Sequence, residues 1–253
     1  MNQRERFFNV LGILILGLIW AVFVAPGDVF IPTLKEVTSE LIALTANGLL
    51  LEDTLASVAR VLAGVGIAAL IVLLLAALTA SVQEFGFLLG GAVELLRPVP
   101  PLAWVPVAIL VFGIGDAPAI AIVALGAFFP LWLGMQQGFS EVRSQHLLAA
   151  RSFGATRMIE LTDVFIPSVM PYAFHGLRLG LGLGWFCVVA AEMMGAHTGL
   201  GYGVQLFSLN LELGRTYCYI LAIGVLGAVM NYGMRALEAR LFRWHRLSVR
   251  GDE

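Results

Sequence analysis

Five charged side chains lie inside long apolar segments and are the first candidates for chemistry in this chain: Arg60, Arg97, Arg178, Glu94 and Glu192. A charge near the centre of a bilayer costs about 2.5–3.5 kcal/mol, so such residues are kept where they have a partner or a task. Pairing Arg60 with Glu192 would offset part of that cost. We expect this pair to fix two spans near the outer mouth as a structural salt bridge; a gate or a substrate contact is the alternative.

Arg178 and Glu192 are too far apart to pair with each other. Fourteen residues separate them on one predicted helix, which corresponds to about 21 Å at 1.5 Å per residue. Arg178 lies near the other end of that helix, where it can snorkel to the interface or contact a neighbouring loop. Arg97 has two open interpretations. It either attracts an anion or contacts Glu94, which precedes it by three residues on the same helical face.

A proline cluster interrupts the apolar segment directly after Arg97. Pro98, Pro100 and Pro101 disfavour a regular helix because proline lacks an amide hydrogen and clashes with the preceding turn. Such breaks occur at membrane depth where protein or a water-filled cavity surrounds the freed backbone groups. We therefore predict that Arg97, Pro100, Pro101 and Trp104 border a translocation path.

Reactive groups with the spacing of an enzyme are absent from the sequence. Lys35 is the only lysine, so there is no G-x-x-x-x-G-K-[ST] loop to cradle ATP phosphates. The apolar segments hold no aspartate pair for an intramembrane protease, and no G-x-S-x-G motif occurs. The histidines lack metal-ligand spacing, and Cys187 and Cys218 are expected to be buried hydrophobic residues rather than a disulfide or metal site. We expect no catalytic residue, metal or cofactor in this chain.

The composition is that of a polytopic membrane protein. Of 253 residues, 59% are hydrophobic and 13% are charged, and the mean hydropathy is +0.90. A soluble domain carries about 25% charged residues. The net charge of -2 and the lack of a basic aromatic patch give no support for nucleic-acid binding. We expect a single all-α membrane domain over residues 1–253.

Six apolar segments are long enough to cross a bilayer, which requires about 20 mostly apolar residues. A signal peptide is the alternative for the first, but its apolar run is too long and no A-x-A site follows it. Residues 34–51 are only mildly apolar, and we expect an amphipathic helix on the membrane surface there. The predicted spans cover residues 7–24, 54–82, 85–112, 118–135, 171–194 and 217–237.

The basic residues predict the orientation of the spans, because positively charged loops stay in the cytoplasm. With the N-terminus inside, only Lys35 and Arg215 fall in outer segments. The predicted cytoplasmic set is Arg4, Arg6, Arg143, Arg151, Arg157, Arg235, Arg240, Arg243, Arg246 and Arg250. We therefore predict that both termini and the loop of residues 140–170 face the cytoplasm.

The loop of residues 140–170 is a polar interruption between two apolar segments, and a loop of this size suggests a docking surface for a soluble partner. Ala149 and Ala150 place small residues on a short helix. Gly154 can adopt the positive φ that separates this helix from a second one. An ordinary amphipathic loop is the alternative.

Prolines and glycines predict the start and packing of the fifth span. Pro167 is expected to end the second helix of the loop, and Pro171 to open the span. Gly176, Gly180 and Gly184 recur every fourth residue, so they share one face and permit close helix contact. We expect that contact within one subunit rather than between subunits.

Several motifs from about residue 54 onward resemble the permease subunits of bacterial ABC importers. The loop sequence Leu148-Ala149-Ala150-x-x-x-Gly154, followed by Val164-x-Ile166-Pro167, resembles the EAA loop of that family. The other matching motifs are Arg60-Val61-x-x-Gly64, Arg97-Pro98-x-Pro100-Pro101-x-Ala103-x-x-Pro106, Gly176-Leu177-Arg178, Ala191-Glu192-Met193 and Gly199-Leu200-Gly201. Together they are similar to the nitrate, sulfonate, taurine and bicarbonate branch. Leu148 departs from the family, which carries an acidic residue there; Arg151, Arg157, Glu160 and His146 are the neighbours that could supply polar contacts instead.

The resemblance implies the type I importer permease fold, with six transmembrane helices and a cytoplasmic coupling helix in a bacterial inner membrane. It implies cytoplasmic ATPase subunits that bind ATP and Mg²⁺, a second permease subunit, expected to be an identical copy, and a periplasmic or lipid-anchored solute-binding protein. The expected docking residues are Leu148, Ala149, Ala150, Arg151, Ser152, Phe153, Gly154, Ala155, Arg157 and Pro167. The expected path or gate residues are Arg60, Arg97, Pro100, Pro101, Trp104, Arg178 and Glu192.

The expected substrate is a small oxyanion or sulfonate, such as nitrate, taurine, an alkanesulfonate or bicarbonate. Three alternatives remain. An ion-coupled secondary carrier would work without an ATPase, and would usually show acidic residues near the midplane. A membrane enzyme would change its solute chemically. An ABC permease of the same kind could also carry a small organic molecule, such as a pyrimidine or an aromatic sulfonate.

Overall fold

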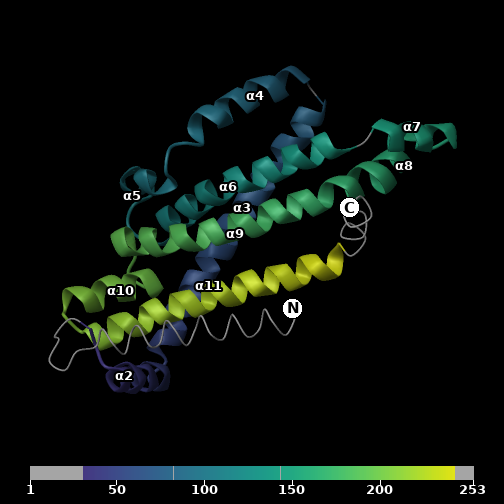
Figure 1. The fold of residues 1–253 in the computed structure, drawn as a ribbon. Helices are drawn as coiled ribbons and strands as arrows, with labels where there is room; N and C mark the ends of the chain where they lie inside the picture. Colours follow the sequence, from purple (N-terminus) through teal and green to yellow (C-terminus); the bar gives the residue numbers. More distant parts are fainter. Residues whose placement is uncertain (1–30, 82, 143, 243–253) are drawn as a thin grey trace.

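The computed structural model describes residues 31–81, 83–142 and 144–242, and this part of the chain is helical, without a strand (Figure 1). The predicted first span, residues 7–24, lies outside the described residues. The elements are α2 (Leu34–Ala46), α3 (Leu49–Ser81), α4 (Gln83–Leu96), the 3₁₀ turn η1 (Pro101–Trp104), α5 (Val105–Phe112), α6 (Asp116–Glu141), α7 (Ser144–Ser152), α8 (Arg157–Ile159), the π-helical segment η2 (Glu160–Phe165), α9 (Ile166–Gly195), α10 (Leu200–Leu209) and α11 (Leu213–Leu241).

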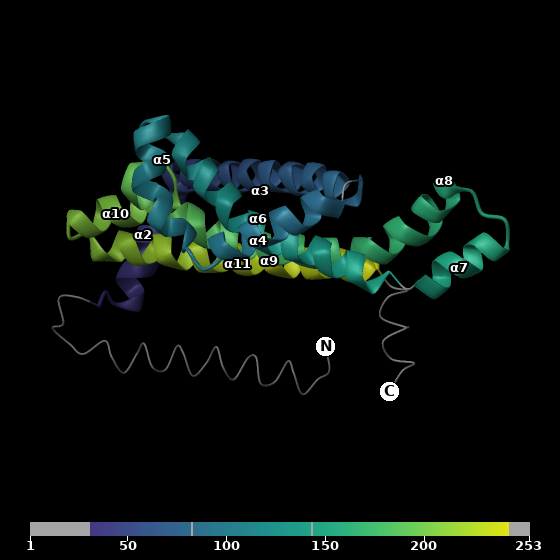
Figure 2. The same ribbon diagram turned by 90° about the horizontal axis from the view of Figure 1, so that it is seen from above.

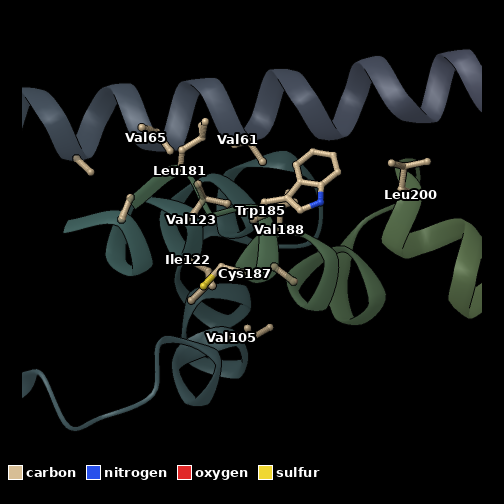
Figure 3. Close-up of a cluster of buried hydrophobic side chains, with 14 of the residues drawn as sticks. Val61, Val65, Val105, Ile122, Val123, Leu181, Trp185, Cys187, Val188 and Leu200 are labelled. Carbon is tan, nitrogen blue, oxygen red and sulfur yellow. The ribbon is translucent and has the colours of Figure 1, made fainter. Parts of the chain in front are cut away.

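Helices α3, α6 and α9 form the core of the bundle. Their facing side chains are mostly valine, alanine, isoleucine and leucine, which fill the space between helices without a polar group. Val61 and Val65 of α3 lie over Val123 of α6, and Val188 of α9 points into the same interior (Figure 3). Trp185 closes this cluster and donates its indole N–H to the backbone carbonyl of Ile223 on α11, at 3.1 Å.

Glycines let α6 and α9 approach until their backbones touch. A methyl group on Gly176 of α9 would lie 2.7 Å from the carbonyl oxygen of Pro130, and one on Gly180 would lie 3.0 Å from that of Ala127. A methyl group on Gly184 would lie 3.1 Å from the Val123 side chain of α6. The predicted glycine face therefore packs within one chain, as small residues do at membrane helix crossings.

Four described helices are long and apolar enough to cross a membrane. They are Leu49–Thr79, Asp116–Glu141, Arg157–Gly195 and Leu213–Leu241. A fifth span results if Glu84–Leu96 and Pro101–Phe112 count together, although these two pieces are bent by 87°. The bend lies where Pro98, Pro100 and Pro101 predicted a break in the span of residues 85–112.

Helix α2 is shorter than the amphipathic helix predicted over residues 34–51. A capping box starts it: the Glu36 amide donates to the Thr33 hydroxyl, and the Thr33 amide donates to the Glu36 carboxylate. It ends at Ala46 because Gly48 takes a φ of 78° that breaks the helix. Residues from Leu49 onward already belong to α3, which therefore begins before the predicted start at residue 54.

Pro167 and Pro171 do not have the roles that the sequence predicted. The chain from Arg157 to Gly195 is one continuous helical run, so Pro167 ends no helix and Pro171 lies inside α9. The π-helical segment η2 makes this possible, because it shifts the backbone pairing by one residue: the Ile166 amide donates to the Leu161 carbonyl. Pro167 then sits in the first turn of α9, where its missing amide hydrogen costs little.

The bundle has two distinct ends. Helices α7 and α8 project beyond the other helices at one end, while α2, α5 and α10 gather at the opposite end (Figure 2). We call these the α7 end and the α10 end. The long helices α3, α6, α9 and α11 connect them.

Candidate functional site

A buried charged cluster lies at the α10 end and is built on one face of α3. Asp53, Ser57 and Arg60 follow each other at spacings of four and three residues, so their side chains share that face. Asp53 and Arg60 are each 5% exposed and Ser57 is fully buried. Three buried polar side chains in one place are stable only when each of them has hydrogen-bonding or ionic partners.

The Arg60 guanidinium joins three other segments. It contacts the Glu192 carboxylate at 2.6 Å and the Asp116 carboxylate at 2.6 Å. It also donates to the Thr198 carbonyl at 2.7 Å and to the Thr198 hydroxyl at 2.8 Å. The structure thus brings Arg60 and Glu192 together, as the sequence predicted, and adds the start of α6 and the α9–α10 turn.

Glu192 is fully buried and holds the beginning of α10. It accepts hydrogen bonds from the Ser57 hydroxyl at 2.8 and 2.9 Å and from the Gly201 amide at 2.9 Å. The Leu200 amide donates to the Ser57 hydroxyl oxygen at 2.9 Å. Two of the amide groups that a helix start leaves without a backbone partner are thereby satisfied by side chains of α3 and α9.

Asp53 extends the same cluster to α11. Its carboxylate accepts from the Gly199 amide at 2.7 Å and from the Tyr219 hydroxyl at 2.7 Å. Gly199 has a φ of 112°, a conformation that favours glycine, and a side chain there would collide with Arg60 and Glu192. We call Asp53, Ser57, Arg60, Asp116, Glu192 and Tyr219 the α10-end cluster.

Sequence reasoning identified two members of this cluster and missed the rest. Arg60 and Glu192 were visible because a charge inside an apolar segment needs a partner. The spacing of Asp53, Ser57 and Arg60 was a usable second signal, since it places three polar side chains on one helix face. Nothing in the sequence indicated Asp116 or Tyr219, because the segments that carry them are distant along the chain.

Arg178 pairs with α11. Its guanidinium donates to the Glu238 carboxylate at 2.8 Å, and His175 lies beside both, 3.6 Å from Glu238. This arrangement replaces the predicted snorkelling or loop contact of Arg178. The contact links α9 to α11 near the α7 end.

The bend between α4 and α5 exposes the residues predicted to border a path. Arg97 and Pro100 are exposed, Pro101 is half-buried and starts η1, and Trp104 is 40% exposed. Glu94 is exposed as well, and within the described ranges Arg97 makes no ion pair with it or with any other residue. The structure therefore does not bring Arg97 and Glu94 together.

Helix α7 ends in a glycine turn that reverses the chain. The Ala155 amide donates to the Ala150 carbonyl at 3.0 Å and the Gly154 amide donates to the Arg151 carbonyl at 2.9 Å. With Gly154 at a φ of 81°, this is a Schellman motif. Thr156 then caps α8 by accepting from the Ile159 amide. Gly154 separates two short helices, as predicted.

An ion pair fastens the two arms of this loop. The Arg151 guanidinium donates to both oxygens of the Glu160 carboxylate, at 2.8 and 3.0 Å. These hydrogen bonds raise the pKa of Arg151 above its usual range. A two-point contact of this kind fixes the relative position of α7 and η2.

The tip of the loop presents apolar side chains. Phe153 is 93% exposed, Met158 is 67% exposed and Leu148, in place of an acidic residue, is 59% exposed. Large apolar side chains exposed together on a projecting element are typical of an interaction site. We call Leu148, Phe153 and Met158 the loop tip. The remaining predicted docking residues, which accompany the tip, are Ala149, Ala150, Arg151, Ser152, Gly154, Ala155, Arg157 and Pro167.

No group of three or more histidine, cysteine, aspartate or glutamate side chains gathers as a metal site in the part of the chain that the structure describes. Cys187 and Cys218 are both buried and unpaired with each other. The Cys218 thiol donates to the Val37 carbonyl at 3.1 Å, and Cys187 packs against Gly126. Their surroundings are those of small hydrophobic residues.

Comparisons with known proteins agree on one family. The family described as binding-protein-dependent transport system inner membrane component matches residues 85–243. A putative ABC transporter permease protein of Methanocaldococcus jannaschii is 31% identical, over 98% of this chain and 95% of its own length. The taurine transport system permease protein TauC of Escherichia coli is 38% identical over 62% of this chain and 58% of its own length. The bicarbonate transport system permease protein CmpB of Synechococcus elongatus is 30% identical over 95% of this chain and 92% of its own length.

A solved structure shares the fold. A chain of the MetNI methionine ABC transporter in an inward-facing conformation superposes with a TM-score of 0.63 and 19% sequence identity. The match covers 79% of this chain and 97% of that chain. The predicted type I importer permease fold is thereby confirmed.

Proposed function

Because this chain belongs to the family of binding-protein-dependent transport system inner membrane components, we propose that it forms the membrane path of an ATP-driven importer for a small anion. It is a permease subunit of an ABC transporter. The chain has no lysine-containing phosphate loop, so separate ATPase subunits bind ATP and Mg²⁺ and carry out hydrolysis. The chain itself contributes no catalytic group.

The projecting loop carries this proposal. Its apolar tip is exposed, its arms are fastened by Arg151 and Glu160, and its second arm continues without interruption into α9. An ATPase that moves the loop tip would therefore also move α9, because the loop and α9 are joined in one helical run. Because α9 packs backbone to backbone against α6, the two helices would move together and expose the path to alternate sides.

The proposed assembly has four protein partners in addition to this chain. Two ATPase subunits bind the loop tips of two permease chains, which we expect to be identical. A periplasmic or lipid-anchored solute-binding protein delivers the solute to the α10 end, and no nucleic acid takes part. The loop and both termini lie in the cytoplasm of a cell whose inner membrane holds the chain. The excess of arginines in those segments supports this orientation.

The proposed substrate is a small oxyanion or sulfonate. Relatives named for taurine and bicarbonate transport support this class, as both solutes carry an anionic group with several oxygens. The bend at Pro100, Pro101 and Trp104 is the element we assign to the path, since a broken helix at membrane depth needs a polar or protein surrounding.

In this proposal the α10-end cluster holds helices together and does not bind the solute. Arg60 and Glu192 are almost fully buried and saturated with protein partners, which leaves them no free group for a solute. The Arg178–Glu238 pair plays the same part near the other end. These residues hold α3, α6, α9 and α11 together as one body.

The docking surface can be tested by a charge on the loop tip. Phe153→Glu should abolish retention of the ATPase when the complex is purified from native membranes. Phe153 is exposed in the single chain, and an aromatic side chain that becomes buried in an interface contributes about 2 kcal/mol or more to binding. Phe153→Leu is the matched control and should keep the ATPase, since it retains an apolar side chain. ATP hydrolysis by the purified complex is measured in parallel.

Two other outcomes are informative. An ATPase that is absent from the wild-type complex would contradict the importer function and favour an ion-coupled carrier. An ATPase that stays with both Phe153 variants would show that the loop tip is not the docking surface.

A further inference from the structure

The sequence places three arginines inside apolar segments, Arg60, Arg97 and Arg178, and two of them are neutralised. Arg60 contacts Asp116 and Glu192, and Arg178 contacts Glu238. Arg97 differs from both, because its side chain is exposed and makes no ion pair or side-chain hydrogen bond with residues 31–81, 83–142 or 144–242. Of the three arginines that the sequence predicts to lie in span interiors, Arg97 is thus the one whose guanidinium has no carboxylate partner among the described residues.

Arg97 lies at membrane depth. Helix α4 starts at Gln83, directly after the end of α3, and its fourteen residues span about 21 Å. That length is shorter than the roughly 30 Å hydrocarbon core of a bilayer. Arg97 follows the last residue of α4 and precedes η1, so it sits in the 87° bend between the two pieces.

The bend itself requires a polar surrounding. Pro98, Pro100 and Pro101 have no amide hydrogen to donate, so the regular helical pairing stops after the Arg97 amide, which donates to the Val93 carbonyl. Beyond it the pairing is irregular: Val99 donates to the Leu96 carbonyl and Ala103 to the Pro100 carbonyl. Irregular backbone of this kind is tolerated at membrane depth only against protein or water. A charged side chain without a partner also needs protein or water around it at membrane depth. The two observations are independent and fall on adjacent residues.

We propose that Arg97 faces the aqueous path and is the residue that contacts the transported anion. Its planar guanidinium presents two parallel N–H groups, which match two oxygens of a sulfonate, nitrate or bicarbonate group. Arg97 is therefore a specificity-determining residue for small oxyanions. This inference rests on the proposed importer function and names the contact by which that function selects its solute.

Glu94 provides the internal control. If Arg97 formed a structural pair with Glu94, removing either charge would have the same effect on transport. If Arg97 binds the anion, Glu94→Gln should leave the apparent KM unchanged or lower it, because it removes a negative charge three residues away. Because Arg97 and Glu94 do not pair in the structure, the effects of their variants on transport can be compared directly.

The first test measures water access without any solute. In a background where the buried Cys187 and Cys218 are replaced by alanine, Arg97→Cys is treated with the anionic reagent 2-sulfonatoethyl methanethiosulfonate. Leu95→Cys is the control, since Leu95 is an exposed apolar residue in the last turn of α4, before the bend. We expect Arg97→Cys to react at least about tenfold faster than Leu95→Cys. Equal or slower reaction would overturn the placement of Arg97 on the path.

The second test measures uptake of labelled nitrate, taurine and bicarbonate by the complete complex in proteoliposomes. Arg97→Gln should raise the apparent KM at least about tenfold, and Arg97→Lys should have an intermediate effect because it keeps the charge but loses the paired donors. ATPase retention should be unchanged in both. Normal uptake by Arg97→Gln, or a wild type that carries none of the three anions, would overturn the proposal. A wild type without an ATPase would instead contradict the importer function, while the thiol assay would still report on Arg97.

Discussion

Arg60 and Glu192 show why a buried ion pair rarely acts alone. Arg60 contacts two carboxylates and a carbonyl, and Glu192 accepts from a hydroxyl and a backbone amide in addition to Arg60. Each extra partner offsets part of the desolvation cost that the bare pair would carry. The cluster therefore fixes four segments at once, and removing one member leaves several groups without a partner.

Glu192→Ala should lower the stability of the protein by about 3–5 kcal/mol, because it leaves a buried guanidinium and the Gly201 amide without their acceptor. Glu52→Ala, an exposed neighbour of the cluster on α3, should be nearly neutral. The measurement is the thermal midpoint of the detergent-solubilised protein. Equal midpoints for the two variants would contradict the role assigned to Glu192.

Exchanging the two charges should not restore stability, contrary to what a simple pair would allow. In the double variant Arg60→Glu, Glu192→Arg, the new glutamate faces Asp116 and the new arginine cannot accept from the Gly201 amide. We expect its midpoint to stay close to that of the single variants. Full recovery would mean that Arg60 and Glu192 form an isolated pair.

The crossing of α6 and α9 depends on glycine at defined positions. Gly176→Ala places a methyl group 2.7 Å from the Pro130 carbonyl oxygen and should destabilise the protein by about 1–3 kcal/mol. Gly182→Ala is the matched control on the same helix, where a methyl group meets nothing within 4 Å. It should be neutral or slightly stabilising, as alanine favours a helix over glycine. The thermal midpoints of both variants are measured. A lower midpoint for Gly176→Ala alone supports a packing role for Gly176, and equal midpoints would mean that glycine serves only helix flexibility there.

The continuity of α8, η2 and α9 links the loop tip to the core. The π-helical segment allows Pro167 to remain in a helical run that a regular α-helix would break there. The loop, α9 and α6 consequently form one mechanical unit. This continuity is what lets a partner at the α7 end influence packing near the α10 end.

The two ends of the molecule have different chemistry. The α7 end presents an exposed apolar tip, while the α10 end holds a buried charged cluster and the only lysine, Lys35, on α2 (Figure 2). In the proposed orientation these ends lie on opposite sides of the membrane, with the tip inside the cell. That separation suits a protein that binds an ATPase on one side and a solute-binding protein on the other.

Sidedness provides the test at this scale. A membrane-impermeant amine reagent should label Lys35 in intact spheroplasts, and peptide mapping distinguishes this site from the N-terminal amine. An impermeant maleimide should label Phe153→Cys only in inverted vesicles, because the native cysteines are buried. The opposite labelling pattern would reverse the proposed orientation.

The class of the protein and the outline of its fold could be predicted from the sequence alone. A low charge content and long apolar segments require a helical membrane protein, because lone backbone groups cannot be left unpaired in lipid. The spacing of Gly176, Gly180 and Gly184 predicted a close helix contact, and the proline cluster predicted a broken span. These features are local: each depends on residues within one or two helical turns.

Which distant side chains meet could not be predicted from the sequence and is known from the packing of the helices. Asp116 and Tyr219 join Arg60 and Asp53 across more than one helix, and Glu238 rather than a lipid headgroup or loop neutralises Arg178. The tertiary structure also decided that Pro167 and Pro171 lie in one helical run, since the shifted pairing of η2 leaves no signature in the residue types. A charge inside a membrane segment indicates that the residue needs a partner. Which residue is the partner depends on helix packing, because packing brings together residues that are far apart in the chain.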